Sequence, residues 1–126
     1  MSISDYLEDA LLNLVFSNTT FPAITAVFGS LHTGDPGETG ANAPLASTPR
    51  EAIVFNAAAS ATAVNATTVQ WTCSATGTVS YLGLWDGSDT GTANHLWSGA
   101  LASAKVVANA GDIVQLSSGQ LSVALA

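Results

Sequence analysis

Three side chains that could do chemistry lie close together between Leu31 and Gly40: His32, Asp35 and Glu38. An imidazole and two carboxylates can bind a metal ion where a loop brings them together, and a metal-dependent hydrolase would then follow. The alternative is a turn, because in Asp-Pro-Gly the aspartate commonly hydrogen-bonds its own backbone. We favour the turn and expect His32, Asp35, Pro36 and Glu38 to belong to a contact surface.

Other candidate sites have similarly ordinary alternatives. The sequence from Asp86 to Thr92 is rich in side-chain oxygens, as calcium loops are, but the final bidentate glutamate is missing. We therefore favour a polar turn over a weak calcium site. His95 and Trp97 could form a ligand-binding pair, although Trp97 fits the core better. Cys73 lies on the apolar side of an alternating strand, which favours a buried thiol over a nucleophile.

Composition narrows the class of protein. Only 9% of the 126 residues are charged, against about 25% in an average soluble domain. The net charge is −7, with Arg50 and Lys105 as the only cations besides histidine. Such a chain repels nucleic-acid phosphates and anionic membranes, so neither is expected as a partner. Without a catalytic motif we expect no enzyme and no cofactor, and without a signal sequence a protein used without export.

An amphipathic helix is predicted from residue 2 to about residue 17. Ser2 or Ser4 can cap it, and the acids of its first turn lie at the positive end of the helix dipole. Its apolar residues form one stripe, made up of Ile3, Leu7, Ala10, Leu11, Leu14 and Val15. We expect Leu7, Leu11 and Leu14 to make contacts. The stripe packs either on the domain's own sheet or on another subunit.

The remainder predicts short strands separated by turns. Apolar and polar residues alternate over the first three segments below, and the last two read as a terminal hairpin joined at 117–119. The segments are 25–33, 67–74, 79–85, 95–101, 105–108, 112–116 and 120–125, with a short buried strand near 53–55. Residues 34–49 are expected to be a mobile loop or an arm ordered by a neighbour. The prediction is a single domain, 1–126: a mainly β, jelly-roll-like antiparallel sandwich of about seven or eight strands with an N-terminal helix.

Three segments together carry a resemblance to a known family. They are 5–19 (DYLEDALLNLVFSNT), 31–37 (LHTGDPG), and 96–101 (LWSGAL) with 103–107 (SAKVV) and the closing Gly111-Asp112. In this order they are similar to a family of small phage virion proteins usually labelled tail fibre or minor tail proteins.

The resemblance implies a non-enzymatic virion structural protein. A globular chain with no shaft favours a capsid decoration (cement) protein over a receptor-binding fibre. The expected location is then the capsid surface, and the expected partners are the major capsid protein and further copies of the chain in a homotrimer. The alternative is a tail fibre or minor tail protein that binds a host glycan through exposed aromatics such as Trp85 or Trp97.

Overall fold

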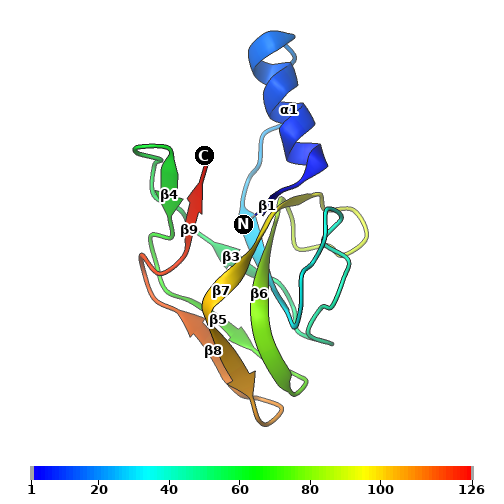
Figure 1. The fold of residues 1–126 in the computed structure, drawn as a ribbon, viewed down its shortest axis with the longest axis vertical. Helices are drawn as coiled ribbons and strands as arrows, with labels where there is room; N and C mark the ends of the chain where they lie inside the picture. The colour runs from blue at the N-terminus through cyan, green and yellow to red at the C-terminus, as the bar shows by residue number, and fades with distance from the viewer. Residues whose placement is uncertain (1, 126) are drawn as a thin grey trace.

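The computed structural model describes residues 2–125 and contains one helix and nine strands in that range. Helix α1 covers Asp5–Phe16. The strands are β1 (Ser2–Ile3), β2 (Val27–His32), β3 (Glu51–Ile53), β4 (Thr62–Val64), β5 (Val69–Thr72), β6 (Gly77–Trp85), β7 (His95–Val107), β8 (Ile113–Leu116) and β9 (Ser122–Ala124). Five strands form a sheet in the order β1-β7-β6-β2-β3, and two ribbons, β4-β9 and β5-β8, complete the fold. The pairings between these strands are antiparallel, so the predicted mainly β class with an N-terminal helix is confirmed (Figure 1).

The core lies between the five-stranded sheet and the β5-β8 ribbon. Val69, Trp71 and Cys73 are buried, as their alternation predicts. The indole N–H of Trp71 donates to the carbonyl of Gly29 in β2 at 2.8 Å. A Cβ at Gly29 would lie 2.8 Å from the Trp71 ring, so glycine is what lets the ribbon approach the sheet this closely.

The predicted terminal hairpin is wrong. Residues 117–120 do turn, but β8 pairs with β5 and β9 pairs with β4, so the two strands enter different ribbons. The fully buried Asn65 hydrogen-bonds to both sides of this turn. Its Nδ2 donates to the Ser117 carbonyl at 3.0 Å, and its Oδ1 accepts from the Leu121 N–H at 2.9 Å. These bonds place the chain after the turn beside β4, with which β9 pairs. Residues 105–107, expected as a separate strand, continue β7.

Residues 34–49, expected as a loop or arm, fold back on their own chain. The Thr33 N–H donates to the Ala43 carbonyl at 2.8 Å, and the Leu45 N–H donates to the Leu31 carbonyl at 2.9 Å. Leu45 joins the core with 4% of its surface exposed. Burial of one leucine and these backbone pairs keep the segment on the sheet.

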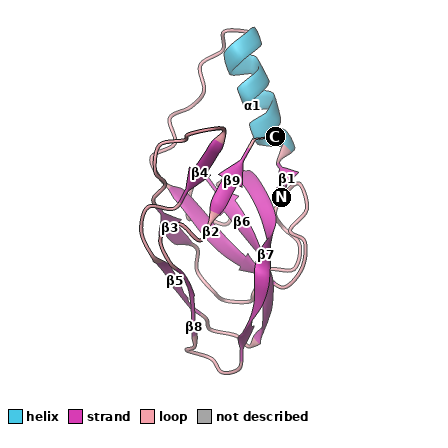
Figure 2. Ribbon diagram, turned by 60° about the vertical axis from the view of Figure 1, so that its left-hand side comes forward, coloured by secondary structure: helices cyan, strands magenta, loops and turns pink. Residues whose placement is uncertain are grey.

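Helix α1 stands out from one end of the strands (Figure 2). Ser4 caps it by accepting the Leu7 N–H, whereas Ser2–Ile3, predicted as helix, pair with Trp97 and Ser98 of β7. At the other end Asn18 takes a positive φ of 53°, and the Thr19 N–H bonds to the Asn13 carbonyl. Among residues 2–125 no helix is long and apolar enough to cross a membrane.

Candidate interaction surface

His32 is a buried, neutral link between two parts of the sheet and the 34–49 segment. Its Nδ1 lies 2.8 Å from the Asn42 carbonyl, which can only accept, so Nδ1 carries the proton. Nε2 then accepts from the Ser30 hydroxyl at 2.7 Å, and that oxygen accepts the Trp85 indole N–H at 2.8 Å. Burial, helped by the positive charge of Arg50, lowers the pKa of His32 more than the Asn42 hydrogen bond raises it.

The carboxylates of Asp35 and Glu38 each accept a hydrogen bond from a backbone N–H. Asp35 accepts the Gly37 N–H at 2.9 Å, which is the predicted turn, and Pro36 behind it is buried. Glu38 reaches the start of α1: its carboxylate accepts the Asp5 N–H at 3.2 Å and the Ser2 hydroxyl at 3.3 Å. The Glu38 carbonyl accepts from Nδ1 of His95 at 2.9 Å. Glu38 therefore ties the segment to the helix.

His32, Asp35 and Glu38 do not converge on one point. Each makes hydrogen bonds to a different part of the chain, and no group of three or more His, Cys, Asp or Glu residues within 2–125 could hold a metal ion. The three side chains instead make hydrogen bonds to separate parts of the fold. It fixes the entry of α1 above the sheet.

The oxygen-rich loop 86–92 is held by protein donors. Both carboxylate oxygens of Asp86 accept from Asn94, from its N–H at 2.6 Å and from its Nδ2 at 2.8 Å. Arg50 donates to the Asp89 carbonyl at 3.0 Å, and its guanidinium lies 3.6 Å from the centroid of the Trp85 ring. These oxygens are already engaged, as in a structural turn.

The tryptophans proposed for glycan binding are not exposed. Trp85 and Trp97 each keep only 7% of their surface accessible, and Arg50 covers the Trp85 ring. A sugar-stacking platform needs an open aromatic face, so this part of the prediction is wrong. Cys73 is buried as predicted, and burial raises the pKa of its thiol.

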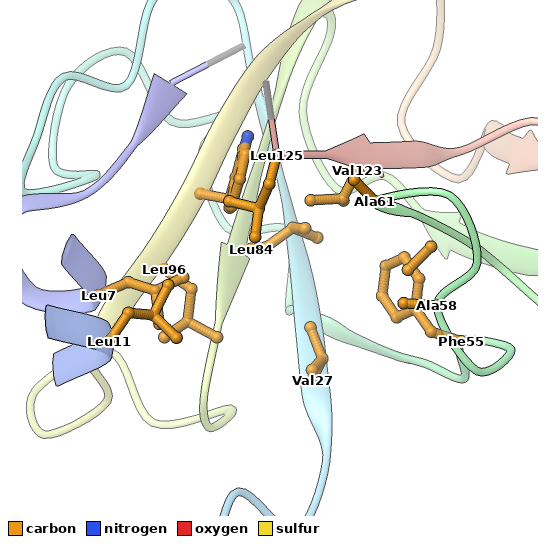
Figure 3. Close-up of a pocket in the computed structure, with 12 residues that line it drawn as sticks. Leu7, Leu11, Val27, Phe55, Ala58, Ala61, Leu84, Leu96, Val123 and Leu125 are labelled. Carbon is orange, nitrogen blue, oxygen red and sulfur yellow. The ribbon is translucent and has the colours of Figure 1, made fainter. Parts of the chain in front are cut away.

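An apolar groove of about 310 Å³ lies where α1 meets the sheet and the β4-β9 ribbon. Figure 3 shows Leu7 and Leu11 on one side, Phe55 and Ala58 on the other, and Leu84 and Val27 between them. The remaining lining residues are also apolar: Ala61, Ala63, Leu96, Trp97, Val123 and Leu125. With no ionisable group in its lining, the groove suits an apolar occupant.

The apolar stripe of α1 begins in this groove and continues past it. Leu7 packs against the core and Leu11 lines the groove, whereas Leu14, one helical turn farther on, is 43% exposed. Val15, also on the stripe, is 68% exposed, and Leu12 and Phe16 beside it are 56% and 81% exposed. Sequence reasoning placed Leu14 and Val15 on the stripe but did not single out Leu12 and Phe16. The signal was available, because residues 10–16 are apolar except for Asn13, and a helix end that is apolar on most faces needs a cover.

Comparison with known families decides the class of protein. A family model described as podophage GP4 fiber I protein gp80 matches residues 2–124. The chain belongs to this family. It is therefore a phage virion structural protein, in agreement with the resemblance drawn from the sequence. No curated protein matches the chain.

Proposed function

We propose that the chain is a non-enzymatic structural subunit of the phage fibre, attached to the virion through its α1 end. The observation that carries the proposal is the uncovered apolar half of α1, which ends in Phe16 with 81% of its surface exposed. Exposed apolar surface of this kind marks an interaction site in a folded protein. The family description, which names a fibre protein, supports the fibre over other virion locations.

Glu38 gives the proposed attachment its geometry. Its carboxylate holds the first turn of α1 against the 34–49 segment, and Ser4 ties the same turn to the carbonyl of His95 in β7 at 2.5 Å. The helix therefore leaves the sheet in a defined direction. A fixed helix loses less conformational freedom on binding than a mobile arm would.

A second candidate is a capsid decoration protein that binds the major capsid protein. It is favoured by the single β-sandwich body and by the shortage of charge, because uncharged surface is desolvated at low cost across a broad interface. In that case the protein would be present in hundreds of copies over the shell. A fibre subunit would be present in a small multiple of the symmetry of the tail.

The proposal is tested on intact particles. Cryo-electron microscopy of virions, with quantitative mass spectrometry of the same preparation, should place the protein on the fibre at low copy number. Density over the capsid at high copy number would overturn the fibre location in favour of decoration. Absence of the protein from purified virions would overturn both.

The role of α1 is tested by complementing a phage that lacks the gene. A chain with Phe16→Ser should fold but be lost from virions. The matched control is Val106→Ser on β7, which is 74% exposed and lies outside the groove. Equal incorporation of both variants would contradict attachment through α1.

A further inference from the structure

We propose that the apolar groove receives the C-terminal half of α1, residues 12–16, from a second copy of the chain. This inference rests on the proposed function and names a partner for the same surface. Each copy offers both halves of the contact, an uncovered apolar helix end and an unfilled apolar groove.

Charge permits a second copy in this arrangement. Copies that each carry a net charge of −7 repel one another, so a contact between them must not place like charges opposite each other. The acids of α1 lie at positions 5, 8 and 9, and residues 10–16 carry no charge. The groove lining carries none either. Helix end and groove can therefore meet without burying a charge.

Polar groups without a partner lie near both surfaces. Trp97 lines the groove, and its indole N–H is buried with no acceptor among residues 2–125. A helix leaves its last carbonyls without partners. In α1 the Asn13 carbonyl accepts from Ser17 and Thr19, while no donor in the described chain reaches the carbonyls of residues 14–16. The Trp97 N–H lies buried beneath the lining, so it does not select the occupant, and the match rests on the apolar surfaces alone.

The shape of the groove sets how the helix would lie. About 310 Å³ holds a few side chains and not a helix backbone. Because Leu7 and Leu11 form one wall, the incoming helix would pack beside the resident α1 and insert side chains such as Phe16. The contact joins different surfaces on the two copies, so repetition closes a ring, such as the expected trimer, or builds a filament.

Cross-linking between two differently substituted chains tests the occupant. A chain with Val15→Cys is mixed with a chain with Ala58→Cys and oxidised, and a mixed disulfide should form because only adjacent residues can be bridged. The matched control is Ala104→Cys, exposed on β7 outside the groove, which should give no mixed product with Val15→Cys. Native Cys73 is buried and should stay unlinked.

Light scattering of the purified full chain supplies the second measurement. The wild type and Val106→Ser should be oligomeric, and Phe16→Ser should lose the oligomer while keeping the wild-type circular dichroism. A monomeric wild type, or Val15→Cys chains that link to each other but not to Ala58→Cys, would overturn the inference. If the wild-type chain is monomeric in solution but is found on the fibre, the inference fails and the proposed function stands. If the wild-type chain self-associates but is absent from virions, the proposed function fails instead.

Discussion

The carboxylate of Glu38 accepts the backbone N–H of Asp5 at 3.2 Å, so a loop residue caps a helix that starts far from it in sequence. The same glutamate reads in the sequence as a possible metal ligand beside His32. Its position at the positive end of α1 gives it a different role. It orients the helix whose far end carries the exposed apolar surface.

Removing this cap should loosen the start of α1. Glu38→Ala is expected to lower the free energy of unfolding by about 0.5–1 kcal/mol, the usual value of a helix cap with its dipole interaction. Urea unfolding measures the loss, and hydrogen exchange should quicken at the amides of residues 5–7. Thr39→Ala, an exposed neighbour without side-chain hydrogen bonds in the described chain, is the control. Equal effects of the two variants would contradict a capping role.

His32 should make stability depend on pH. Because its pKa is lowered in the folded state from an ordinary value of 6.5, the unfolded chain binds the proton first as pH falls. The stability is therefore fully present above about pH 6.5 and is lost on acidification, at up to about 1.4 kcal/mol per pH unit. Urea unfolding between pH 8 and pH 5 measures this slope. His32→Asn should be less stable at pH 8 but show a flatter slope, and an unchanged slope would exclude His32 as its source.

Gly40 should tolerate no side chain. Its φ is +71°, and a Cβ would lie 2.5 Å from Cζ2 of Trp85 and 2.7 Å from Cδ2 of His95. Gly119→Ala is a matched control, because its φ is +81° and nothing lies within 4 Å of the added atom. Gly40→Ala should cost about 1–3 kcal/mol more than the control, which is the usual penalty of overpacking. Thermal unfolding measures both, and equal costs would mean that backbone strain alone matters at Gly40.

Calcium should not stabilise the loop 86–92. A ligand present at one hundred times its dissociation constant adds about 2.7 kcal/mol to stability, so the melting temperature in millimolar calcium and in chelator tests for a site directly. We expect no difference. Asp86→Asn should lower the melting temperature equally in both buffers, because the lost interaction is with Asn94. If calcium raised the melting temperature of the wild type, and Asp86→Asn abolished that increase, the calcium-site alternative would be restored.

The sequence by itself determined the features that depend on near neighbours. The alternation around Trp71 predicts a strand with one buried face, Ser2 or Ser4 followed by acids predicts a helix near the N-terminus, and Asp-Pro-Gly predicts the turn at Asp35. These signals are local because strand alternation, helix capping and turn hydrogen bonds involve residues within a few positions of each other.

Tertiary structure alone decided the pairings between distant residues. Asn65 sends β8 and β9 to different ribbons, Glu38 meets α1, and Arg50 covers Trp85. None of these contacts has a period or spacing in the sequence, because each joins segments that only the folded sheet brings together. For the same reason the sequence placed Leu7, Leu11 and Leu14 on one stripe, but only the fold separated the part inside the groove from the part left uncovered.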